Sequence, residues 1–247
     1  MRLAVIADIH GNALALEAVL ADIDALGIEN IVNLGDHFSG PLEAGRTAAI
    51  LAGRPMLSVR GNHDRYLIEQ APEQMGKSDR CARDQLDDAA MDWLRNLPVT
   101  ASFRDSVYLC HANPADDHHY WLESVADDGS VVPRAGAEIE QLAAGIRERL
   151  ILCGHSHLQK TYRLADGRLI VNPGSVGCPA YDDDGPLYPA HKVEAGSPDA
   201  RYAIASERAG DWEIEFRTVD YDHGAMADLA LRRNRPEWAR GLATGRL

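Results

Sequence analysis

The chain has 247 residues, enough for one large domain with a substantial buried core. Its 38 Asp and Glu residues outnumber its 25 Lys and Arg residues, which gives a net charge of −13. A surface of this charge repels nucleic-acid phosphates and anionic membranes over most of its area, so neither is an expected partner.

The first residues, MRLAVIADIH, contain an apolar run that Asp8 and His10 soon interrupt. This run is too short for a signal peptide or a membrane span, so a cytoplasmic location is expected. The four cysteines are scattered along the chain without a C-x-x-C spacing. Such cysteines suit buried thiols in a reducing compartment better than disulfides or a zinc site.

Over the first sixty residues, short aliphatic runs alternate with amphipathic segments. Residues 3–7, 28–34 and 55–59 have the composition of buried strands. Between them, apolar side chains recur at helical spacing over 12–26 and 42–51. Strands that alternate with helices in this way predict a parallel sheet.

The remaining chain predicts helical cover followed by shorter strands, hairpins and loops. The predicted elements are helices over 64–96, an antiparallel pair (99–103 with 107–110), a turn-rich acidic stretch (114–136), a helix (137–146), a strand (150–153), two hairpins (161–164 with 169–171, and 202–206 with 212–219) and a C-terminal helix (226–233). Pro, Gly and Asp are dense over 179–198, which predicts a long irregular loop. No boundary is visible, so residues 1–247 are expected to form a single domain.

Five predicted strands are each followed directly by side chains that can bind metals. The five clusters are Asp8-x-His10, Gly35-Asp36, Gly61-Asn62-His63-Asp64, His111 and Gly154-His155-x-His157. Each cluster alone is a weak signal, since an isolated histidine on an apolar strand is more often a core residue. Together they place ligands for divalent metals at nearly every strand end, where loops gather into a crevice. The sequence therefore predicts a metal site, with the glycines allowing sharp turns and close backbone approach.

These clusters, in this order, resemble the signature of the calcineurin-like metallophosphoesterase superfamily, in particular its small bacterial and archaeal phosphodiesterase-like branch. The segment Asn172-Pro173-Gly174-Ser175-Val176-Gly177 also resembles a motif of that family, and the resemblance covers about residues 1–219. It implies an α/β (α+β sandwich) fold in which two mixed β-sheets pack face to face with flanking helices.

The resemblance also implies a dinuclear metal centre that hydrolyses phosphodiesters or phosphomonoesters through a bridging hydroxide. One ion would be held by Asp8, His10, Asp36 and His157. The other would be held by Asp36, Asn62, His111 and His155, with Asp36 as the shared ligand. Manganese, iron, zinc and cobalt all suit such ligands, with manganese or iron favoured.

His63 follows Asn62 directly, and the resemblance implies that it acts as the general acid on the leaving group. Asp64 is the next residue, and we expect its carboxylate to orient the imidazole of His63. Two departures from the family pattern are His37 after Asp36 and Ala112 after His111. We interpret His37 as a polar residue at the mouth of the loop, with contact to substrate phosphate as the alternative.

Two further acidic segments are interpreted as ordinary loops. Asp116, Asp117, His118 and His119 predict a solvated loop that could reach the rim of the pocket. The three aspartates at 182–184 do not predict a third metal, because successive carboxylates in such a loop cannot readily converge on one ion.

Three alternatives to a small-molecule phosphoesterase remain open on the sequence. The same core also serves protein phosphatases of the serine/threonine type and nucleotide hydrolases, since their differences lie in the covering loops. A metal-binding scaffold without turnover is the third alternative, although the presence of His63 and of all the ligand positions argues against it. The sequence leaves the oligomeric state open.

Overall fold

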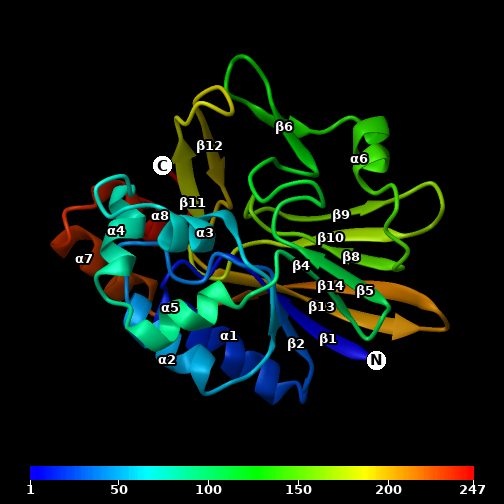
Figure 1. Ribbon diagram of the computed structural model, residues 1–247, viewed down its shortest axis with the longest axis horizontal. Coiled ribbons are helices and arrows are strands. Elements are labelled where there is room, and N and C mark those ends of the chain that lie inside the picture. Colours follow the sequence, from blue (N-terminus) through cyan, green and yellow to red (C-terminus); the bar gives the residue numbers. More distant parts are fainter.

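A computed structural model describes residues 1–247, and two five-stranded β-sheets form its centre (Figure 1). The strands of the first sheet are β1 (Arg2–Ile6), β2 (Ile31–Asn33), β3 (Leu57–Ser58), β13 (Ala200–Arg208) and β14 (Asp211–Val219). Their order is β14-β13-β1-β2-β3. β1, β2 and β3 run parallel, as predicted, whereas β13 pairs antiparallel with both β1 and β14.

The second sheet is also mixed. Its strands are β4 (Thr100–Phe103), β5 (Val107–Cys110), β8 (Leu150–Leu152), β9 (Gln159–Arg163) and β10 (Leu169–Pro173). Their order is β4-β5-β8-β10-β9. The antiparallel pairs β4 with β5 and β9 with β10 confirm two of the predicted hairpins, and β13 with β14 confirms the third.

The two sheets pack face to face, and alternate residues of the strands fill the space between them. Leu3 and Val5 of β1 belong to a buried cluster that also contains Leu109 of β5 and Leu152 of β8. Ala4 and Ile6, which alternate with these residues along β1, pack with the cluster on the other face of the first sheet. This alternation follows from the two-residue period of a β-strand. The predicted sandwich of two mixed sheets is therefore confirmed.

Helices flank the sandwich, and most of them cover the outer face of the first sheet (Figure 1). On that face Leu16 and Ile23 of the first helix share a buried cluster with Tyr202 of β13. Ile139, from a helix on the opposite side of the molecule, packs against the second sheet instead. The helices are α1 (Ala13–Ala25), α2 (Ala44–Ala52), α3 (Asn62–Glu69), α4 (Lys77–Arg83), α5 (Asp88–Arg95), α6 (Gly136–Leu142), α7 (His223–Arg232) and α8 (Pro236–Thr244).

The predicted irregular loop at 179–198 is wrong, because this segment contains the antiparallel strands β11 (Ala180–Asp183) and β12 (His191–Glu194). The acidic stretch 114–136 likewise contains a short hairpin of β6 (Glu123–Val125) and β7 (Val131–Pro133). β11 packs against α8, a helix that the sequence pattern does not predict. Tertiary contacts therefore order a segment whose composition alone favours turns.

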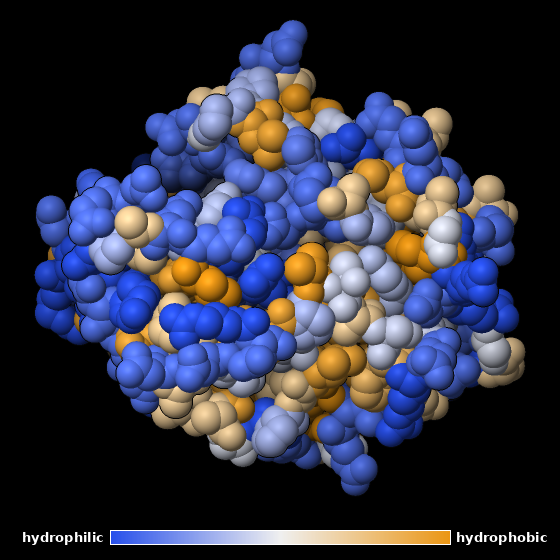
Figure 2. Space-filling model, viewed as in Figure 1, coloured by the Kyte–Doolittle hydropathy of each residue, from blue (hydrophilic) through white to orange (hydrophobic).

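The surface agrees with the acidic composition. The face shown in Figure 2 is mostly hydrophilic, and its apolar side chains lie in small separate groups. None of the helices combines the length and the hydrophobicity needed to cross a lipid bilayer.

Candidate metal centre

The structure brings together all seven side chains that the sequence predicts as metal ligands. Asp8, His10, Asp36 and Asn62 follow the strands of the first sheet, and His111, His155 and His157 follow strands of the second. The carboxyl ends of the parallel strands of both sheets therefore meet at one side of the sandwich.

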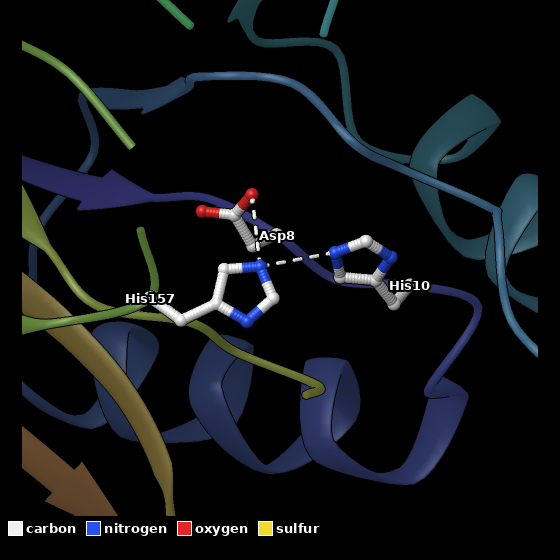
Figure 3. Close-up of side chains that lie close together, drawn as sticks. All are labelled: Asp8, His10 and His157. Atoms are coloured by element: carbon white, nitrogen blue, oxygen red, sulfur yellow. Dashed lines mark hydrogen bonds and ion pairs between the residues drawn. The ribbon is translucent and has the colours of Figure 1, made fainter. Parts of the chain in front are cut away.

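The first group consists of Asp8, His10 and His157, whose ligand atoms all lie within 4.8 Å of one another (Figure 3). His10 Nε2 lies 3.2 Å from His157 Nε2, and His157 Nε2 lies 3.4 Å from Asp8 Oδ1. All three side chains are buried. Two ring nitrogens and a carboxylate oxygen thus converge from two distant parts of the chain.

The second group consists of Asp36, His111 and His155, with Asn62 beside it. His111 Nε2 lies 3.0 Å from Asn62 Oδ1 and 3.4 Å from Asp36 Oδ2. The same Asp36 oxygen lies 3.8 Å from His10 Nε2 of the first group. Asp36 Oδ2 is therefore placed between the two groups.

Hydrogen bonds to main-chain carbonyls fix which nitrogen of each histidine faces the centre. The Nδ1 atoms of His10, His111 and His157 lie 2.7–2.8 Å from the carbonyl oxygens of Ser39, Leu34 and Cys178. His155 is turned the other way, with Nε2 2.7 Å from the carbonyl of His118. Because a carbonyl can only accept, each of these nitrogens carries the proton, and the other nitrogen of each neutral ring offers a lone pair to a metal.

The backbone at these positions is strained. Asp8, His10, Asp36, His155 and His157 have φ angles of +55°, +51°, +55°, +70° and +57°. Left-handed conformations of residues other than glycine cost on the order of 1–3 kcal/mol each where they are sparsely populated, and they concentrate at functional sites. Hydrogen bonds between the two loops, from Asp8 N to Gly35 O and from His10 N to Asp36 O, help to hold this conformation.

Two glycines allow the ligand loops to approach one another. Gly35 has φ +105°, and a Cβ atom there would lie 2.6 Å from Gly61 N and 2.9 Å from His111 Nδ1. A Cβ atom on Gly61 would overlap Asp36 Oδ1. Larger residues at either position would displace a predicted ligand, which confirms the close approach expected at these glycines.

The segment at residues 172–177 holds the ligand loops through hydrogen bonds. Ser175 Oγ donates to the carbonyl of Asp8 at 2.7 Å, and the Gly177 amide donates to the same oxygen at 3.1 Å. Asn172 Nδ2 donates to Gly154 O at 2.7 Å, in the turn before His155. This segment thus links the loop after β1 to the loop after β8.

The pKa shifts differ in direction among the ligand histidines. Burial and the neighbouring His157 lower the pKa of His10 to about 4, and burial with His111 lowers that of His155 to about 3. Burial also opposes charge on His111, but the carboxylate of Asp36 outweighs it and raises the pKa of His111 to about 10. In the metal-free chain, the extra proton on His111 thus offsets the negative charge of Asp36. A bound cation would take the place of that proton.

The donor set fits divalent cations. Asp8 Oδ1 is fully buried and accepts no hydrogen bond within the protein, and its neighbour at 3.4 Å, His157 Nε2, is itself placed to bind a cation. Imidazole nitrogens, carboxylates and an amide oxygen suit manganese, iron, zinc or cobalt.

The structure contradicts the expectation that Asp64 orients His63. His63 Nδ1 lies 2.8 Å from Oδ1 of Asp79, an α4 residue that is 5% exposed. Burial disfavours the charged imidazole of His63, but Asp79 and then Asp36 outweigh burial and raise its pKa to about 9. Because Asp79 accepts the Nδ1 proton, Nε2 remains free to act on a substrate. Asp79 lies outside the sequence motifs, and only the fold brings it to His63.

Asp64 instead ties two ligand loops together. Its carboxylate accepts hydrogen bonds from the amides of Asp36, His37 and Gly61 at 2.9, 3.0 and 2.9 Å. It also lies 2.8 Å from Nδ1 of His37, whose side chain is fully buried and does not line the cavity at this centre. Contact of His37 with substrate is therefore not supported, and it is not a residue of the loop mouth.

A cavity of about 330 Å³ opens above the two groups. Its walls include residues that the sequence motifs do not mark, from the loop at 116–119, β11 and α8. The residues of these walls are His118, Tyr181, Asp182, Asp183, Arg235 and Trp238. The loop at 116–119 thus reaches the rim, and Arg65 anchors it through two 2.7 Å hydrogen bonds to Asp117.

Known proteins are similar to this chain in sequence and in fold. An uncharacterised protein of Methanocaldococcus jannaschii is 28% identical over 260 residues, covering 96% of this chain and 94% of its own. A metallophosphoesterase from Sphaerobacter thermophilus has a similar structure, with a TM-score of 0.75, 24% identity and coverage of 99% and 100% of the two chains. A hypothetical protein from Pyrococcus horikoshii OT3 gives a TM-score of 0.75 at 19% identity, with coverage of 99% and 98%.

The family comparison agrees with the fold. Residues 1–195, which include all seven predicted ligands, match the calcineurin-like phosphoesterase superfamily domain. This match identifies the class of protein, and the two structural relatives share its fold. The chain belongs to the calcineurin-like phosphoesterase superfamily, whose members are phosphoesterases that use divalent metals.

Proposed function

We propose that this phosphoesterase holds two divalent cations and hydrolyses phosphodiester or phosphomonoester bonds of small molecules. The observation that carries this proposal is the position of Asp36 Oδ2 within 3.8 Å of His10 Nε2 and 3.4 Å of His111 Nε2. Asp36 would be shared by both cations, with Asp8, His10 and His157 on one and Asn62, His111 and His155 on the other.

When bound, such a pair of cations supplies a nucleophile at neutral pH and positive charge for the phosphoryl oxygens. The protein contributes the proton for the leaving group. His63 lines the cavity and is held through Nδ1 by Asp79, so its Nε2 would donate a proton to the oxygen of the departing alcohol. Asp64 contributes by positioning Asp36 and the start of α3.

The size of the cavity favours a small substrate. A volume of about 330 Å³ is within the range of pockets that enclose small molecules, which run from about 300 to 1,000 Å³. A protein phosphatase would need an open groove, and a scaffold without turnover would have no use for the His63–Asp79 pair. We propose manganese or iron as the metal, because both accept this mixture of nitrogen and oxygen ligands.

A hydrolysis assay tests the proposal. Purified protein with added Mn²⁺ should cleave 4-nitrophenyl phosphate, bis(4-nitrophenyl) phosphate or both, and EDTA should abolish the reaction. The His63→Ala variant should lower kcat about 100-fold or more for phenyl phosphate, whose leaving oxygen needs a proton, and much less for the 4-nitrophenyl esters. Absence of metal-dependent turnover with either ester would favour the scaffold. The ratio of diester to monoester rates would identify the preferred bond.

A further inference from the structure

The cavity above the two ligand groups contains one Arg side chain, that of Arg235, and no Lys among its lining residues. Arg235 immediately precedes α8, and its side chain is only 14% exposed. In a chain of net charge −13, a largely buried arginine at the mouth of a reaction cavity needs a physical reason. Glu237 lines the same cavity and pairs with the guanidinium, so Arg235 offers a ligand a directed N–H donor rather than an unpaired positive charge.

The guanidinium of Arg235 is held in place on three sides. Nε donates to Glu237 Oε1, and Nη1 donates to Ser78 Oγ at 3.0 Å. The ring of Trp238 lies 5.9 Å from the guanidinium carbon. These contacts leave Nη2 without a hydrogen-bond partner in the protein, so a fixed donor remains for a ligand. A guanidinium suits a carboxylate or a phosphate, because its donors match their oxygens.

The neighbours of Arg235 place it on the leaving-group side of the cavity. Ser78, which holds Arg235, is followed in α4 by Asp79, which holds His63. A general acid must lie beside the oxygen of the departing alcohol. Since adjacent residues of α4 hold both side chains, a group bound by Arg235 would lie on the side of that alcohol.

Acidic side chains also line this cavity. Asp182 and Asp183 of β11 line the same cavity. An anionic substituent would be repelled by these carboxylates and stabilised where it meets Nη2 of Arg235, which gives the cavity a preferred orientation for its substrate.

We propose that Arg235 is a specificity residue that binds an anionic group, a carboxylate or a second phosphate, carried by the leaving alcohol of the substrate. This inference rests on the proposed phosphoesterase function and on His63 as the acid. It defines the substrate class as small phosphate esters with a negative charge on the alcohol.

Two esters of equal shape and different charge test this inference. With Mn²⁺ present, the wild-type protein should hydrolyse 4-carboxyphenyl phosphate with a kcat/KM about tenfold or more above that of neutral 4-carbamoylphenyl phosphate, mainly through a lower KM. The Arg235→Gln variant should reduce this ratio to about one. Arg235→Lys, which keeps the positive charge but loses the planar set of guanidinium N–H donors, should give an intermediate ratio. A third ester, 4-phosphonophenyl phosphate, separates phosphate from carboxylate as the preferred anion.

Arg240→Gln is the matched control, because Arg240 lies on α8 but is exposed and does not line the cavity. It should keep the wild-type ratio. An equal loss of kcat/KM for both esters in Arg235→Gln, or a wild-type ratio of one, would overturn the inference while hydrolysis itself persists. No hydrolysis of any ester would instead remove the proposed function, and the inference with it.

Discussion

The four histidines at the centre are each held through the ring nitrogen that faces away from it. Their partners are main-chain carbonyls of loop residues, as for His111 with Leu34 and His157 with Cys178. A carbonyl partner fixes both the tautomer and the orientation of the ring without adding charge. The free nitrogens therefore point into the centre before any cation arrives.

The hydrogen bond between His63 and Asp79 fixes the orientation of the proposed general acid. Asp79→Asn retains an oxygen for the Nδ1 proton but removes the charge that favours protonated His63. We expect kcat to fall about tenfold or more for phenyl phosphate, whose leaving oxygen needs a proton, and much less for 4-nitrophenyl phosphate, whose phenolate leaves readily. Steady-state kinetics on both esters measure the difference.

Asp84→Asn provides the control for this change. Asp84 follows α4, and its side chain is 59% exposed and paired with Arg80. It should leave both rates near those of the wild type. If Asp79→Asn slowed the two esters equally, Asp79 would have only a structural role.

At the scale of elements, the loops after β2 and β3 depend on one buried carboxylate. Asp64 is fully buried and accepts from three amides and from His37. Asp64→Ala leaves these donors unsatisfied, so we expect the free energy of unfolding to fall by about 3 kcal/mol and metal affinity to weaken. Chemical denaturation and metal titration measure the two effects.

Glu69→Ala serves as the comparison for Asp64→Ala. Glu69 lies at the end of the same helix, α3, with a side chain that is 54% exposed, and its removal should change stability little. Unchanged stability in Asp64→Ala would mean that the two loops are held by other contacts.

The elements that sequence reasoning could predict are those with local signals. Strands with a strong aliphatic pattern were predicted, as were hairpins whose turns, such as Arg104-Asp105 and Ala209-Gly210, adopt the positive φ angles of tight turns. The convergence of the seven side chains could also be anticipated, because each follows a strand directly.

Other features depend on contacts between distant segments. β11 and β12 have few apolar residues and are ordered by packing that includes α8, so their composition resembles that of a loop. Asp64 is adjacent to His63 in sequence, yet its position in the first turn of α3 directs its carboxylate to the loop after β2. Asp79 and Arg235 lie outside every motif, and tertiary structure alone brings them to the cavity.

At the scale of the molecule, the proposed cations would join the two sheets. Their ligands come from segments after β1, β2, β3, β5 and β8, and several of those residues have strained backbones. Binding to the folded state alone stabilises it, by about 4 kcal/mol at a thousandfold excess over Kd. We expect the Tm to fall when metal is removed with EDTA and to recover on adding Mn²⁺, as followed by thermal unfolding. An identical Tm with and without metal would indicate that no cation bridges the sheets.

The sharing of Asp36 between two cations can be measured as the metal content of purified, Mn²⁺-loaded protein. We expect two ions per chain in the wild type, a loss of about one in Asp8→Asn, and a loss of both in Asp36→Asn, since the Asp36 carboxylate lies beside ligand nitrogens of both groups. A wild-type protein that saturates with one ion or none, or an Asp36→Asn variant that still holds two, would contradict it.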